Sequence, residues 1–277
     1  MRSSTPARAF VCFVLFAAVG TAGGPARADV STAPHRLPSQ AQLDVLGRLI
    51  ADTPDESPEK PDLIFRRALM YLECADYYAA LPNPEAAVKA QQWRLAGVKA
   101  LLALVDPPTY AAWPRMDEAL FTLADQLTRV RKEEAARKYF KRLVTEHPRS
   151  RFVANGFASF GDYYFTQNDF GNALKFYQKV LQFPDAAVGD YARYKSAWCY
   201  FDQGDLKQAL DEFAAVAQSH RDERLEREAR KDAVRVYAKI GDRSRARAFF
   251  ERIAPPDEVD DLLGRLDELA RDQDSTR

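Results

Sequence analysis

Apolar residues recur at intervals of three and four positions over most of this chain, which is typical of amphipathic helices. Residues 120–127 show this spacing, and residues 136–143 show it again. The same two patterns then return along the chain, and the alanines near the start of the second pattern are 37, 36 and 37 positions apart. These alanines are Ala136, Ala173, Ala209 and Ala246. A regular interval of this size predicts an array of helical hairpins.

The four predicted units share one design. Each has a first helix with a small or apolar residue at the closest helix–helix contact, then a turn, then a second helix with an aromatic residue four positions after its alanine. Gly204-Asp205 and Gly241-Asp242 are each expected to end a first helix and to cap the next one. No unit can bury its apolar face alone, so neighbouring units must stack. The fold class is therefore predicted as all-α, a right-handed α-solenoid.

The flanking segments add a fifth hairpin and two end pieces. Residues 64–71 follow the first-helix pattern, and a second helix is expected from about Glu85 to Leu104 after a proline-rich break. Residues 29–61 are predicted as a short helix, around 40–50, followed by a proline-rich charged linker. The repeat array is assigned to 62–254, a capping helix to 255–271, and a disordered tail to 272–277.

The N-terminus has the pattern of a secretory signal peptide. Arg2 and Arg8 precede an apolar run, residues 9–20, that is too short to span a bilayer. Ala26-Arg27-Ala28 then matches a cleavage site, so residues 1–28 are predicted to be removed, leaving no stable membrane span. An uncleaved anchor is the alternative. Export would place the chain in an oxidising compartment.

The chain resembles the tetratricopeptide-repeat (TPR) superfamily from about residue 62 to 254. The resemblance is most specific in Gly161-Asp-Tyr-Tyr164 and in Trp198-Cys-Tyr200 with its Gly204-Asp205-Leu206 turn. It is similar to exported TPR proteins of Gram-negative envelopes, and the run 55–61 is most like the gliding-motility type of myxobacteria. About five TPR-like hairpins with a C-terminal cap are expected.

The resemblance implies a periplasmic scaffold or adaptor that mediates protein–protein interactions in a cell-envelope machine for motility, division or outer-membrane assembly. Partner segments would bind in the concave groove of the array. The alternative is a structural subunit of an envelope complex, held by its convex face and termini, with no free peptide ligand. For that alternative, the N-terminal helix and the face of Leu263 and Leu266 would carry the contacts.

Positions that face the groove in TPR proteins can be carried over to this chain. They predict a partner-binding site made of Phe121, Phe165, Tyr191, Tyr194, Trp198, Phe201, Lys231, Arg235 and Lys239. Two alternatives stay open. The stripe of Tyr194, Trp198 and Phe201 has a spacing that also fits core packing, and the three cations also fit a solvated face.

Some residues depart from the family pattern. Arg67, Arg193, Ser196 and Val234 stand where other residues are usual. They put local packing in doubt, because Arg193 and Ser196 at packing positions would allow their helix to rotate and bury its aromatic stripe.

Composition and motifs argue against several other functions. Lys+Arg and Asp+Glu both number 40, so there is no bulk charge that would attract nucleic acid. Cys74 and Cys199 fall in helices three repeats apart, and they are expected to be buried and unbridged. No catalytic motif occurs, and His35, His147 and His220 are scattered. We therefore expect no enzyme activity, no cofactor, no metal site and no small-molecule substrate.

Overall fold

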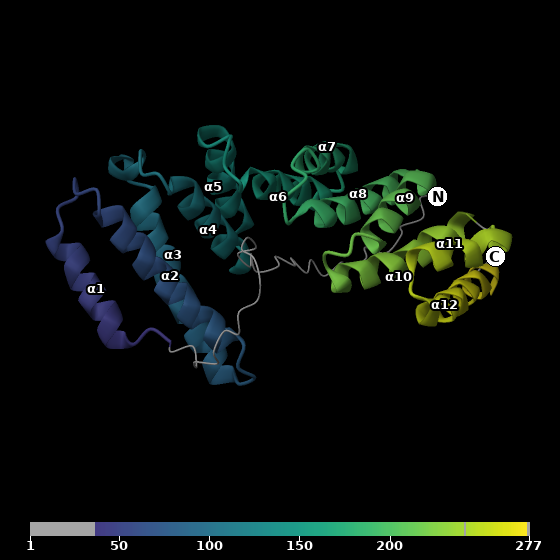
Figure 1. The fold of residues 1–277 in the computed structure, drawn as a ribbon, viewed down its shortest axis with the longest axis horizontal. Coiled ribbons are helices and arrows are strands. Elements are labelled where there is room, and N and C mark those ends of the chain that lie inside the picture. The colour runs from purple at the N-terminus through teal and green to yellow at the C-terminus, as the bar shows by residue number, and fades with distance from the viewer. Residues whose placement is uncertain (1–36, 241, 276–277) are drawn as a thin grey trace, which may run out of the picture. The chain divides into compact units, whose positions relative to one another are not determined.

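The computed structural model describes residues 37–240 and 242–275. The predicted signal peptide, residues 1–28, and the start of the 29–61 segment lie outside the described residues. Within the described residues the chain forms twelve α-helices and two short 3₁₀ turns, with no strand (Figure 1). None of the helices in this part of the chain is long and apolar enough to cross a membrane.

The helices pair into five antiparallel hairpins, with one helix before the first pair and one after the last. Their bounds are α1 Gln40–Asp52, α2 Lys60–Ala79, α3 Pro84–Val105, α4 Met116–Arg129, α5 Glu133–Glu146, α6 Val153–Thr166, α7 Phe170–Val180, α8 Gly189–Gln203, α9 Leu206–Ala217, α10 Glu223–Ile240, α11 Ala246–Ile253 and α12 Pro256–Ser275. Most helices pack mainly on their neighbours in the sequence, and α12 also packs on α10. The predicted α-solenoid of about five hairpins is thus confirmed.

Small residues set the distance between the two helices of a hairpin. The four repeat alanines that predicted the period are at most 2% exposed. Gly161 of α6 packs so closely on α7 that a β-carbon there would lie 2.5 Å from Cε1 of Tyr177. Large side chains such as Phe140, Tyr177, Phe213 and Phe250 fill the space beside these contacts and are fully buried.

Three of the turns inside the hairpins use left-handed backbone at one residue. Arg131, Asn168 and Gly204 have φ values of 60°, 58° and 84° in three equivalent turns. Next to Gly204, the carboxylate of Asp205 accepts a hydrogen bond from the backbone N–H of Gln208 at 3.2 Å and so caps α9. The sequence prediction for the Gly204 turn is confirmed, whereas Gly241 lies outside the described residues.

The first hairpin contains the polar departure noted at Arg67. Arg67 of α2 lies beside Gly47 of α1, where a β-carbon would be 3.0 Å from its Nη2. Its guanidinium lies 5.4 Å from the ring centroid of Tyr71, and its Nε is buried without a hydrogen-bond partner. Packing is preserved because Gly47 leaves room for the long side chain.

The capping helix α12 packs on α10 and α11. Buried Arg230 of α10 binds Glu258 through Nε–Oε2 at 2.8 Å, which ties the cap to the array. Leu266 is 3% exposed and Leu263 is half-buried, so the array itself covers most of the face of Leu263 and Leu266. The helix also runs to Ser275, so the boundary predicted at 271 was too early, since no helix-breaking residue follows Arg271.

Both described cysteines are buried and neither is bridged. Cys74 is 2% exposed and Cys199 is fully buried, which confirms the prediction that they act as small apolar side chains. Burial raises the pKa of the Cys199 thiol to about 12, and it also raises the pKa of Cys74.

Candidate partner-binding face

The first helices of four successive hairpins, α4, α6, α8 and α10, carry the predicted site residues. We call the surface that these four helices contribute the first-helix face. Tyrosine–aspartate hydrogen bonds link its helices. Tyr191 of α8 donates to Oδ1 of Asp162 on α6 at 2.8 Å, and Tyr194 of α8 donates to Oδ2 of Asp232 on α10 at 2.5 Å. Helix α8 is therefore tied to both of its neighbouring first helices.

The two acceptor carboxylates are partly withdrawn from water. Asp162 also accepts a hydrogen bond from Tyr177 at 2.7 Å. Burial raises the pKa of Asp162, although the nearby Lys195 and the two tyrosine hydroxyls oppose the change. Burial likewise raises the pKa of Asp232, against the Tyr194 hydroxyl and Arg235. Both acids are held in place as acceptors between repeats.

Two phenylalanines of the face each lie beneath a lysine from the next first helix. The Nζ of Lys195 on α8 is 3.4 Å from the ring centroid of Phe165 on α6. The Nζ of Lys239 on α10 is 4.7 Å from the ring centroid of Phe201 on α8. Both rings are half-buried. Each pair presents an apolar surface beside a positive charge.

Trp198 does not belong to the exposed part of this face. It is 7% exposed, and its ring meets those of Phe213 and Phe201 edge to face at 5.5 Å and 5.4 Å. The core alternative is the one observed, so the prediction of Trp198 as a groove residue is wrong. On the same helix, Ser196 is also buried, and Arg193 pairs with Glu212 of α9 at 3.2 Å.

The other predicted residues divide into separate groups. Phe121 is half-buried and stacks on Phe152, with ring centroids 4.4 Å apart, away from the α8 and α10 group. Exposed Lys231 pairs with Glu228 at 3.0 Å, and Arg235 lies 3.5 Å from Asp232. Tyr194, Phe201, Arg235 and Lys239 are brought together across α8 and α10.

Three residues of the face were not assigned to the site from sequence. They are Asp162, Asp232 and Lys195, which provide the links between successive first helices. Their partners lie 29, 38 and 30 positions away in the chain, and no constant interval marks them. Asp162 falls on a position that faces the groove in TPR proteins, which was the one available signal.

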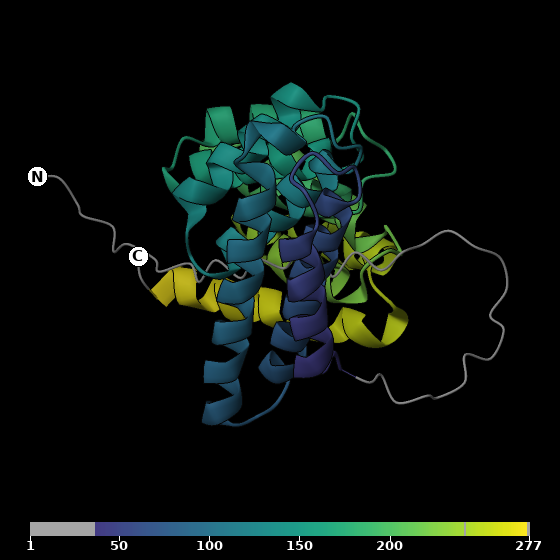
Figure 2. The ribbon, with the colours of Figure 1, turned by 90° about the vertical axis from the view of Figure 1, so that its left-hand side faces the viewer.

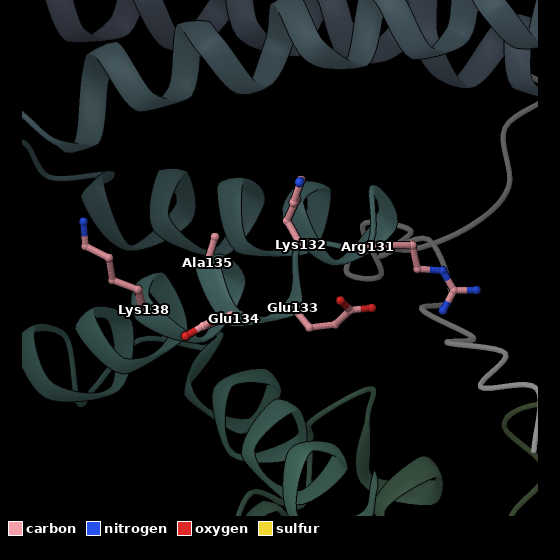
Figure 3. A pocket seen from close by; sticks show the side chains of 6 residues that line it. All are labelled: Arg131, Lys132, Glu133, Glu134, Ala135 and Lys138. Atoms are coloured by element: carbon pink, nitrogen blue, oxygen red, sulfur yellow. The ribbon is translucent and has the colours of Figure 1, made fainter.

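A surface hollow lies outside this face, at the start of α5. Arg131, Lys132, Glu133, Glu134, Ala135 and Lys138 line it. Figure 3 shows the charged ends of these side chains pointing in different directions and converging on no common point. Among the described residues, no group of three His, Cys, Asp or Glu side chains could hold a metal ion.

The buried carboxylate of Asp162 predicts a pH-dependent effect of its replacement. Its pKa is raised in the folded state, so its contribution to stability is complete below the unfolded pKa, about 3.9, and is lost as pH rises through the folded pKa. Asp162→Asn removes this titration. We therefore expect the variant to gain stability relative to the wild type as pH rises above 4, measured by urea unfolding across a pH series.

Asp169 provides a control of opposite sign. Hydrogen bonds from the side chain and backbone of Asn172 lower the pKa of Asp169, so its contribution is present above the unfolded pKa and is lost as pH falls. Asp169→Asn should lose stability relative to the wild type as pH rises. If the stability of both variants relative to the wild type changed with pH in the same way, the burial of Asp162 would not disfavour its charged form.

One comparison with known families agrees with the repeat architecture. The tetratricopeptide repeat family model matches residues 118–150 and 191–222, which correspond to α4–α5 and α8–α9 with their following turns. Among solved structures, the crystal structure of MamA aligns at 15% sequence identity with a TM-score of 0.46, covering 67% of this chain and 99% of that one. No curated protein matches the chain. The chain thus carries tetratricopeptide repeats in an all-α solenoid, an architecture of protein-interaction scaffolds that are in general not catalytic.

Proposed function

We propose that this protein is a periplasmic scaffold of a cell-envelope machine that binds segments of partner proteins along its first-helix face. The observation that carries this proposal is the pair of half-buried phenylalanines, Phe165 and Phe201, each with a lysine of the next repeat over its ring. Aromatic rings that lose water on binding are common hot spots of interfaces. The N-terminal pattern of residues 1–28 supports export.

The two ring–lysine pairs indicate the chemistry of the bound segment. An apolar side chain would replace water on the exposed part of the ring. A carboxylate next to it would meet the lysine, which is within reach of the same ring. The segment would thus combine apolar and acidic side chains. It would bind on α6, α8 and α10, where both pairs lie.

Site-specific photo-crosslinking tests this assignment. A benzoylphenylalanine in place of Phe201 should form adducts with a partner protein in living cells, because Phe201 lies on the proposed face. The same probe in place of the exposed Asp211 on α9 is the matched control and should form none. Lys239→Glu should lower the adduct yield in envelope extracts mainly at low salt, since exposed charges are screened within about 10 Å at 0.1 M.

Two results would count against the proposal. One is equal crosslinking from positions 201 and 211, which would remove the first-helix face as the site. The other concerns the compartment: sequencing of the mature N-terminus should begin at Asp29. A protein that still starts at Met1 and stays in the cytoplasm would refute the periplasmic assignment.

A specific observation also favours the alternative, a structural subunit held through its N-terminal end. Among the described residues, the large apolar side chains that remain exposed are concentrated in the first three helices. They are Val45, Leu49, Leu69, Tyr77, Val88 and Leu95, and only Ile240 lies elsewhere. Crosslinks from position 45 or 88, with none from position 201, would favour this alternative.

A further inference from the structure

The outer face of α1 is an apolar surface at the N-terminal end of the array. The opposite face of α1 is buried on α2 through Leu43 and Leu46, and Figure 2 shows α1 lying along α2. On the outer face, Val45 is 56% exposed and Leu49 is 48% exposed. These two side chains are four positions apart, so they lie next to each other on the helix.

The two ends of the array differ in this respect. A repeat array needs terminal helices with polar outer faces, because no further repeat covers them. Helix α12 meets this requirement, since the side chains on its outer side are charged and exposed. They include Asp257, Asp261, Arg265 and Glu268. Helix α1 does not meet it, which indicates that its outer face is covered in the assembled protein.

The charges beside Val45 and Leu49 indicate what covers it. Asp44 and Arg48 are both exposed and lie together along one side of the apolar pair. Neither has an ion pair within the described part of the chain, and Asp44 accepts only a hydrogen bond from the Gln40 side chain at 2.7 Å. When a second copy of the same helix runs antiparallel, its Arg48 lies opposite Asp44 of the first copy and its Asp44 lies opposite Arg48. The two helices are therefore complementary in charge.

We propose that the outer face of α1 binds α1 of a second copy of this chain, as an antiparallel pair about a twofold axis. In such a pair, Val45 of one copy packs on Leu49 of the other, and Asp44 pairs with Arg48. Both pairings place the axis near residues 46–47, which is the middle of α1. Because the interface is isologous, each contact occurs twice.

The size of the helix determines how stable this dimer is. Thirteen residues make a helix about 20 Å long, and stable dimers bury roughly 1,200–2,000 Å². A single helix from each copy provides less than this. The dimer is therefore concentration-dependent, and the proposal does not depend on the function assigned to the first-helix face.

Sedimentation equilibrium of the purified protein tests the proposal. The average mass should rise from monomer toward dimer as protein concentration increases. Val45→Glu with Leu49→Glu should keep the protein monomeric at every concentration. Val88→Glu with Leu95→Glu on α3 is the matched control, because these two residues are exposed to a similar degree, 56% and 52%, and this variant should still dimerise.

Charge exchange gives a sharper test of the antiparallel register. Arg48→Asp alone places two acids opposite each other and should weaken dimerisation roughly tenfold. Adding Asp44→Arg restores both pairs, so the double variant should dimerise like the wild type. Circular-dichroism melting checks that each variant is folded.

Three outcomes would overturn the proposal. One is a wild-type protein that is monomeric at all concentrations. Another is equal loss of dimer in the α1 and α3 variants. The third is a wild type that stays monomeric while the α1 variant melts at a lower temperature or no longer binds a different protein. That result would show that another segment of the chain or another partner covers this face.

Discussion

Trp198→Ala is expected to lower the free energy of unfolding by about 3–5 kcal/mol, the range for removing a large aromatic side chain from a core. Trp198 is 7% exposed and contacts the rings of Phe213 and Phe201. Its removal leaves a cavity that the buried Phe213 cannot easily fill, since its own ring also packs against Tyr194. Urea unfolding followed by circular dichroism measures the change.

Phe201→Ala is the natural comparison for this variant. Phe201 is half-buried, so its truncation should destabilise the protein less than that of Trp198. If Phe201 takes part in binding, its variant should form fewer partner adducts from a benzoylphenylalanine at position 165 of the same face, while keeping most of its stability. A Trp198→Ala protein that unfolds at the same urea concentration as the wild type would disprove the core assignment.

Gly161→Ala should also destabilise the protein, by about 1–3 kcal/mol, as is typical when a packed core is overfilled. The added β-carbon would lie 2.5 Å from Cε1 of Tyr177. The Tyr177 ring is fully buried and its hydroxyl donates a hydrogen bond to Asp162. The ring therefore cannot move away without breaking this hydrogen bond. The clash should outweigh the gain of about 1 kcal/mol that alanine has over glycine in a helix.

Gly264 of α12 supplies the matched control. A β-carbon at Gly264 would meet no atom within 4 Å. Gly264→Ala should therefore raise the stability of the protein, up to about 1 kcal/mol if the propensity acts alone. Thermal melting tests whether Gly161→Ala lowers the stability while Gly264→Ala raises it. Equal effects at the two positions would show that Gly161 is not a close-packing point.

The hairpins could be predicted from the sequence because their signal is local and repeated. The spacing of Ala136, Ala173, Ala209 and Ala246 reflects a contact that every hairpin makes in the same way. The second helix of the first hairpin was placed within one residue at each end, since Pro84 marks its start. Helix α12 was ended too early, because a polar sequence with no breaker allows a helix to continue.

The binding face was harder to predict, because it depends on the rotation of each helix about its axis. Trp198 has the spacing of a groove residue and of a core residue alike, and only its contacts with Phe201 and Phe213 in the folded chain decide between them. The bonds from Tyr191 and Tyr194 to aspartates of other repeats join residues far apart in the chain. Such pairings follow from the way repeats stack, which no local pattern encodes.

The burial of Cys74 and Cys199 has a consequence for measuring motion in this protein. A thiol reacts as its thiolate, and both groups are buried with raised pKa values, so neither reacts with a thiol reagent while its surroundings stay closed. Reaction at Cys74 reports opening of the first hairpin, and reaction at Cys199 reports opening of the fourth. The two labelling rates therefore compare how often distant repeats open within one molecule.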